Sequence, residues 1–132
     1  MSDNGLVTVA SNHSVKDTID RAAANLAAKG IAVFARVDHA AGAASVGMAL
    51  RPTEVLIFGS PKAGTPLMQS QQSIGIDLPL KLLAWQDEAG QVWLAYNDMH
   101  WLARRHQLGG HSASAVSGLA SVLDGLAKAT AA

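Results

Sequence analysis

The chain has 132 residues, of which 49% are hydrophobic, and its ten basic residues balance its ten acidic ones. This length and composition fit one folded domain, residues 1–132, that needs neither a disulfide nor a metal to build a core. The charge balance argues against a nucleic-acid partner, which would require a basic excess. The absence of cysteine excludes thiol catalysis and thiolate metal sites. Residues 1–5 resemble no secretion leader, and no apolar run nears the ~18 residues that span a bilayer, so we expect a cytoplasmic protein without a membrane partner.

The first half of the chain predicts three strands and two helices. Ser14, followed three residues later by Asp17, is typical of a helix N-cap, and Gly30 is placed to end that helix. Asp38 suits the cap of a shorter helix. Runs rich in Val, Ile and Phe indicate the strands. In chain order we expect a strand over 6–10, a helix over 14–30, a strand over 31–37, a short helix over 39–46 and a strand over 53–58.

The segment from Gly59 to Pro66 is predicted to be a loop that leads into a helix over 67–73. Thr65 suits the N-cap of that helix, and Pro66 suits its first position. Free backbone N–H groups and the helix dipole favour an anion at such a start, where Lys62 would add a positive charge. The alternative is that the Thr-Pro pair only starts the helix. The segment is no Walker loop, because it lacks Gly-Lys-Ser/Thr. Its candidate ligand-binding residues are Gly59, Ser60, Lys62, Gly64 and Thr65.

A hairpin and two helices complete the chain. Strands over 78–87 and 91–97 flank a turn in which Gly90 supplies the positive φ. Asp98 suits the cap of a helix that ends near residue 106, and a last helix over 112–128 has one apolar face. The hairpin and the unequal spacing of the elements argue against a regular doubly wound sheet. We therefore expect an α+β fold: a five-stranded mixed or mostly antiparallel sheet with helices packed mainly on one face.

Alternating residues divide the hairpin into two faces. The face predicted to lie in the core comprises Leu80, Leu82, Ala84, Val92, Leu94 and Tyr96. The other face carries Trp85 and Trp93, which a simple register places side by side. Three explanations stay open for these tryptophans: a helix of the same chain covers them, they form a subunit interface, or they stack on a ligand.

Polar side chains gather near the open end of the hairpin. Lys81 lies near the start of one strand and Asn97 near the end of the other, and in a hairpin these ends meet. Arg105 and His106, on the following helix, are expected to fold back over them. A cation, an acid and an imidazole suit acid–base catalysis or the binding of a carboxylate or phosphate. The alternative is structural: Asp98 caps the helix, and ion pairs of Lys81 and Arg105 fasten it to the sheet. The cluster comprises Asp77, Lys81, Tyr96, Asn97, Asp98, Arg104, Arg105 and His106.

Two stretches of the chain resemble one known family. The first stretch is Phe58-Gly59-Ser60-Pro61-Lys62-Ala63-Gly64-Thr65-Pro66-Leu67-Met68. The second comprises Asp77-Leu78-Pro79-Leu80-Lys81, Trp85, Asp87, Gly90, Val92-Trp93, Tyr96-Asn97-Asp98 and Leu102-Ala103-Arg104-Arg105-His106-Gln107-Leu108. Together they resemble the domain-of-unknown-function family numbered three hundred and two. The resemblance implies a small bacterial α+β domain, commonly a homo-oligomer, and brings no settled reaction or cofactor. Ser60 stands where the family pattern has Asn, and His100 where it has a small residue.

The favoured hypothesis is a small homo-oligomeric domain, most simply a dimer, that binds a small anionic or polar ligand. The ligand would lie between the Gly59–Pro66 loop and the group formed by Lys81, Asn97, Asp98 and His106. The alternative is an enzyme at the same place, with His106 or Asp98 as the acid or base and Lys81 or Arg105 as the electrostatic stabiliser.

A third hypothesis is an assembly module whose only task is the Trp85/Trp93 surface. No metal site is predicted, because His100 and His106 are six residues apart and face different sides of a helix. No Gly-x-Ser-x-Gly elbow marks a catalytic serine, and no cofactor is expected.

Overall fold

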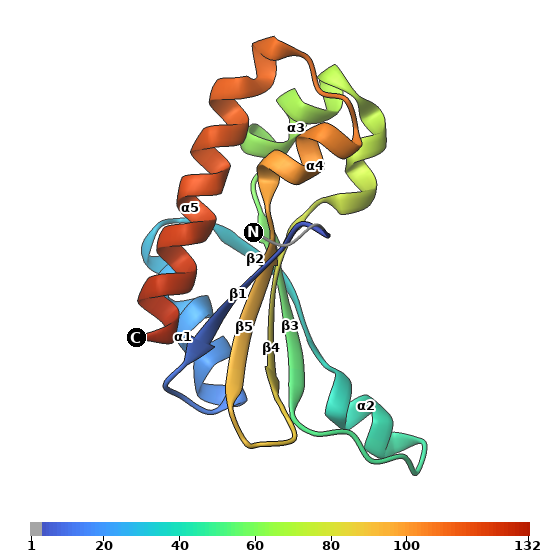
Figure 1. The fold of residues 1–132 in the computed structure, drawn as a ribbon, viewed down its shortest axis with the longest axis vertical. Coiled ribbons are helices and arrows are strands. Elements are labelled where there is room, and N and C mark those ends of the chain that lie inside the picture. The colour runs from blue at the N-terminus through green and yellow to red at the C-terminus, as the bar shows by residue number, and fades with distance from the viewer. Residues whose placement is uncertain (1–3) are drawn as a thin grey trace.

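The computed structural model describes residues 4–132, so residues 1–3 of the polar N-terminal start lie outside the described part. Its centre is one five-stranded sheet with the strand order β1-β5-β4-β3-β2, in which every neighbouring pair is antiparallel (Figure 1). The predicted α+β fold is confirmed, and all five strands lie where the sequence pattern places them. The strands are β1 (Leu6–Ser11), β2 (Ala32–Asp38), β3 (Thr53–Gly59), β4 (Leu80–Gln86) and β5 (Val92–Asn97).

The helices occupy three places around the sheet. The two long helices, α1 (Val15–Ala28) and α5 (Ala113–Ala131), pack on one face of it. Two shorter helices, α3 (Pro61–Ser70) and α4 (Met99–Arg105), lie at one end, and α2 (His39–Ser45) projects from the other end (Figure 1). Two 3-10 helices, η1 (Gln72–Asp77) and η2 (Gly110–Ser112), complete the elements. Across residues 4–132, none of the helices combines the length and the hydrophobicity that a membrane span requires.

Local sequence signals explain where three of the helices begin. The Ser14 side chain accepts a hydrogen bond from the Asp17 backbone N–H, as a helix cap should. The Asp38 side chain caps α2 in the same way, and the Asp98 side chain caps α4. Gly30 has a φ of 71°, the left-handed conformation that ends helices. These predicted caps are therefore confirmed.

The predicted start of α3 is wrong. Thr65 does not cap a helix at Pro66, because the helix begins at Pro61 with Ser60 as its N-cap residue. The backbone N–H of Ala63 already donates to the Ser60 carbonyl at 3.0 Å. Two prolines in this segment both fit a first helical position, and the earlier one starts the helix. The segment expected to be an open loop is therefore the first part of α3, and Pro66 lies inside the helix.

The hairpin of β4 and β5 has the two faces that alternation predicts. The expected core residues are buried beneath α1 and α5; they are Leu80, Leu82, Ala84, Val92, Leu94 and Tyr96. Trp85 pairs with Trp93 on the opposite face. Both indoles stay partly exposed, and α1 and α5 lie on the other side of the sheet. Of the three explanations left open for these tryptophans, a covering helix of the same chain is therefore not supported by the described residues.

Candidate functional site

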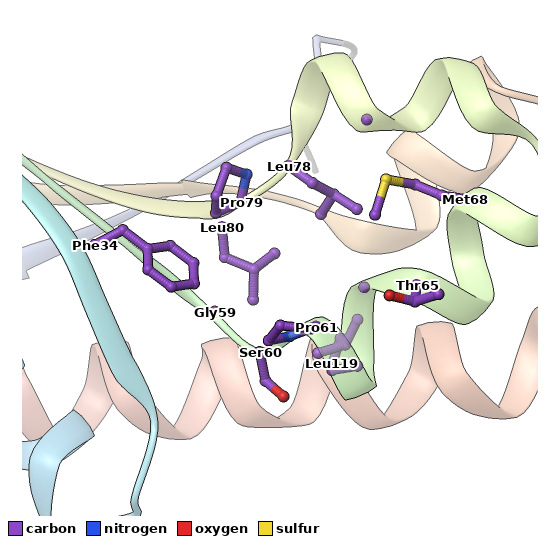
Figure 2. Close-up of a pocket in the computed structure, with 13 residues that line it drawn as sticks. Phe34, Gly59, Ser60, Pro61, Thr65, Met68, Leu78, Pro79, Leu80 and Leu119 are labelled. Carbon is purple, nitrogen blue, oxygen red and sulfur yellow. The ribbon is translucent and has the colours of Figure 1, made fainter.

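A cavity of about 280 Å³ lies where β3 runs into α3 (Figure 2). One wall comes from the first turns of α3, and the opposite wall from the end of η1 and the start of β4. Strand β2 and helix α5 each add one residue to the rim. The lining residues are Phe34, Gly59, Ser60, Pro61, Ala63, Gly64, Thr65, Met68, Gly75, Leu78, Pro79, Leu80 and Leu119.

The lining is mainly apolar. Among the described lining residues, only Ser60 and Thr65 carry a polar side chain, and none is charged. Four of the five predicted loop residues line the cavity, whereas Lys62 does not. The loop residues thus gather at one place, as the sequence suggests, but the walls around them are not those of an anion site.

Two of the glycines that line this cavity differ in the space beside them. A Cβ atom on Gly64 would lie 3.6 Å from Leu78 Cδ1 and 3.8 Å from Met68 Cε, which is ordinary contact. A Cβ atom on Gly75 would lie 3.3 Å from Met68 Sδ, which is tight. A larger side chain at Gly64 would therefore grow into the cavity, whereas the space beside Gly75 is already filled by Met68.

Phe34 forms the outer rim. It lies at the irregularity of the β2–β3 pairing between Val33 and Ala35, and such a bulge turns a side chain away from the regular alternation. Figure 2 shows its ring beside Gly59 and Pro79 at the mouth of the cavity. The side chain remains 52% exposed, so the cavity is open to solvent on the β2 side.

A separate cluster of three hydrogen-bonded polar side chains, Ser73, Asp77 and His106, lies on the other side of η1. The His106 Nε2 atom is 2.5 Å from Asp77 Oδ2, and its Nδ1 atom is 2.9 Å from Ser73 Oγ. The His106 side chain is only 6% exposed and that of Asp77 15%. In the tautomer that carries its proton on Nε2, the ring donates to the Asp77 carboxylate and Nδ1 accepts a hydrogen bond from the Ser73 hydroxyl.

Arg105 and Asp98 fix the helix that carries His106. Arg105 Nη1 lies 3.2 Å and 3.0 Å from the two carboxylate oxygens of Asp77. Asp98 caps α4 by accepting from the His100 N–H at 2.9 Å. The Arg105–Asp77 pair fastens α4 to η1, and the Asp98 side chain caps the start of α4. This is the structural alternative that the sequence left open for Asp98 and, in part, for Arg105.

The remaining candidates do not converge on one place. Lys81 donates to the Pro79 carbonyl at 3.1 Å. Tyr96 lies on the core face, where burial raises the pKa of its hydroxyl and the nearby carboxylates of Asp124 and Asp98 add to the rise. Asn97 is paired with β1 in the sheet. None of the hairpin and α4 candidates lines the cavity, so the two predicted groups do not share it.

The two tryptophans stabilise the hairpin near its turn. Trp93 Nε1 donates to Asp87 Oδ2 at 2.8 Å. This hydrogen bond is the main reason why the pKa of Asp87 lies below its ordinary value. The paired indoles therefore have a role within the chain itself.

The sequence did not point to Ser73 or Phe34. Ser73 is 33 residues away from its partner His106, and nothing in the local pattern announces that contact. In the sequence, Phe34 does not differ from the other apolar residues of its strand. The bulge in the β2–β3 pairing brings its ring to the cavity.

Comparison with known proteins identifies relatives of this chain. A family model described as "Domain of unknown function DUF302" matches residues 7–126. Proteins of Brucella suis and Brucella abortus, both named fluoride-specific ion channel FluC 1, are 57% identical to it over 107 residues, which are 81% of this chain. That match covers 42% and 40% of the two proteins, so the chain spans less than half of their length.

A solved structure has the same fold. The crystal structure of an uncharacterized conserved protein DUF302 from Bacillus stearothermophilus aligns with a TM-score of 0.83. The alignment covers 96% of this chain and 98% of the other at 16% sequence identity. At that identity the likeness concerns the fold alone.

Proposed function

This chain belongs to the DUF302 family, whose description assigns no reaction, and from that premise we propose that it is a binding module for a small, mainly apolar molecule. The ligand occupies the cavity between α3 and the segment that joins η1 to β4. The cavity itself is the observation that carries the proposal: about 280 Å³ of space, lined almost wholly by apolar groups. Small-molecule sites in proteins are concave and mainly apolar, and this volume lies just below their usual range, which fits a small ligand.

The polar groups in the lining define how the ligand is held. Ser60 and Thr65 supply hydroxyls that donate or accept a hydrogen bond. Figure 2 shows the Thr65 hydroxyl on the cavity side of α3. We therefore propose a small neutral molecule with an apolar body that carries one hydrogen-bonding group.

This proposal departs from the small anionic or polar ligand that the sequence suggested. An anion requires several N–H donors or a cation, because a buried unpaired charge is costly. Lys62 lies outside the lining. The N–H groups of Ala63 and Gly64 both donate to the Ser60 carbonyl. An apolar body with one polar end is the better match to these walls.

The names of the Brucella relatives raise fluoride as a ligand. Fluoride is a small anion that binds where charged or N–H donors surround it, and the lining described here offers two hydroxyls and no charge. We therefore propose that this domain does not hold fluoride in the cavity. Titration of the protein with sodium fluoride, followed by ¹⁹F NMR, should show no saturable broadening of the fluoride signal.

Native mass spectrometry and a fluorescent probe test the binding proposal. Freshly purified protein is examined for a retained small molecule and then titrated with N-phenyl-1-naphthylamine, which fluoresces in apolar sites. Gly64→Leu grows into the cavity and should abolish the saturable signal. Gly118→Leu is the matched control, because that glycine is also helical and has no atom within 4 Å of its Cβ position. Equal binding by both variants would refute the proposal.

A second candidate function rests on one specific observation, the chain of contacts from Ser73 through His106 to Asp77. A hydroxyl, an imidazole and a carboxylate in this order are the parts of an activated serine nucleophile. Ser73 is exposed and His106 is buried, so a substrate would reach the hydroxyl while the base stays fixed. This candidate is an acyl-transfer or hydrolytic activity on an ester.

Covalent labelling tests this candidate. Ser73 Oγ would attack the phosphorus of a fluorophosphonate probe, fluoride would leave, and the hydroxyl proton would pass to His106 Nδ1. One adduct per chain that is lost in Ser73→Ala and slowed in Asp77→Asn would support an activated serine. An unlabelled wild-type protein would leave the three residues as a structural lock between α4 and η1.

A further inference from the structure

One continuous part of the chain has no core of its own. From residue 31 to residue 52, a segment that we name the β2–α2 arm, no residue is buried. All seven residues of β2 are exposed, and so is most of α2. Figure 1 shows α2 projecting away from α1 and α5 at the far end of the sheet.

Helix α2 buries none of its residues against the rest of this chain. It has seven residues, none of them buried, and it contains Gly42. Isolated helices this short are marginal in water, because few hydrogen bonds offset the cost of nucleation. A helix of this kind becomes stable when its side chains pack against a partner.

The arm also presents an apolar surface and an unpaired strand edge. Six of its large hydrophobic side chains are 39–70% exposed; they are Val33, Phe34, Val37, Val46, Met48 and Leu50. The outer edge of β2 has no strand beside it in the described sheet. The other edge strand, β1, is contacted by α5 and alternates in exposure. Long apolar edges invite pairing unless charges, prolines or a covering element block them. The two charged residues of β2 are held within the chain, Arg36 by Asp20 and Glu54, and Asp38 as the cap of α2.

We propose that the β2–α2 arm is the contact surface for a second copy of this chain. Every strand pair of the sheet is antiparallel, and an identical strand placed antiparallel by a two-fold axis satisfies the free edge of β2 in the same way. The arm has about twenty residues, the number that one partner contributes to a standard interface. The chain has no net charge, so two copies do not repel each other.

The proposed interface adjoins the cavity. Phe34 belongs both to β2 and to the cavity rim, and the cavity is open on that side. A second copy docked along β2 covers Phe34 and closes the mouth of the site. This consequence rests on the proposed binding function, whereas the interface itself does not.

Light scattering coupled to size exclusion tests the interface without any ligand. The wild-type protein should have twice the mass of the chain. The double substitution Val46→Asp/Met48→Asp changes two side chains that are 70% and 67% exposed in the single chain, so it should leave the monomer fold intact by circular dichroism. It should raise the dimer dissociation constant by more than about 30-fold, as the loss of an interface hot spot does.

Two controls distinguish this surface from others. Val122→Asp changes an exposed apolar residue on α5 and should leave the dimer unchanged. Trp93→Ala tests the open face of the sheet. A monomeric wild-type protein, a dimer that survives the double substitution, or a dimer that dissociates with Trp93→Ala alone would each overturn the proposal. A dimer with an empty cavity would refute the binding function and leave the interface standing.

Discussion

Substitution of Gly64 by leucine provides a quantitative test of the cavity. In both Gly64→Leu and Gly118→Leu a helical glycine is replaced, which stabilises a helix by about 1 kcal/mol. At Gly118 the new side chain meets nothing within 4 Å of its Cβ, so that gain is all we expect. At Gly64 the side chain enters apolar surroundings beside Leu78 and Met68. Full burial of a leucine is worth about 1.5–3 kcal/mol.

Because the cavity is open to solvent at Phe34, a leucine at position 64 is only partly buried, and the stabilisation from its burial is smaller than this. We expect Gly64→Leu to exceed Gly118→Leu by about 1 kcal/mol in the free energy of unfolding. Urea denaturation followed by circular dichroism measures the free energy of unfolding of both variants and the wild type. The values can be compared if the dependence of this free energy on urea concentration is the same in all three proteins. If Gly64→Leu is no more stable than Gly118→Leu, the leucine does not fit, and the space that we assign to a ligand is not available.

Three further predictions concern the sheet and the contacts at its ends. Asp77→Asn should lower the free energy of unfolding by about 2 kcal/mol, because His106 loses a buried charged partner; an unchanged urea midpoint would contradict this. The Trp93 hydrogen bond lowers the pKa of Asp87 in the folded state, so the resulting stability is present above the ordinary pKa of 3.8 and is lost as pH falls through the folded value. Trp93→Phe should therefore raise the Asp87 pKa in a carboxyl NMR titration; the same titration midpoint in both proteins would disprove the assignment. Gly5→Ala should destabilise the fold by more than about 1 kcal/mol, because Gly5 has a φ of 76° and a Cβ there collides with an indole in α4; near-wild-type thermal stability would argue against that packing.

Structural features that depend on interactions between residues close together in the chain could be predicted from the sequence. The alternation from Leu80 to Tyr96 identified the buried face of the hairpin, because neighbouring side chains of a strand point to opposite faces. The caps at Ser14 and Asp98 were readable for the same reason, since each bonds a backbone N–H two or three residues away. Local chemistry alone decides such features.

Features that depend on contacts between residues far apart in the chain could not be predicted from the sequence. The segment around Ser60 and Thr65 contains two equally good helix starts, and the choice of Pro61 places Leu67 in the core, fully buried. The partners of His106 lie 29 and 33 residues away, at Asp77 and Ser73. The sequence placed Asp77 and His106 in one polar cluster but gave no reason to prefer that pair over Lys81 or Asn97.

The two candidate sites are joined by η1. Gly75 lines the cavity, while Ser73 and Asp77, two residues to either side, hold His106. A Cβ on Gly75 would lie only 3.3 Å from Met68 Sδ, so we expect a ligand that needs more room here to shift Met68 or η1, and a shift of η1 changes the contacts of the imidazole. Coupling of this kind is reciprocal. Loosening η1 from the other flank with Asp77→Asn should therefore change the affinity for N-phenyl-1-naphthylamine although Asp77 does not touch the cavity, and an unchanged affinity would show that η1 holds the two sites apart.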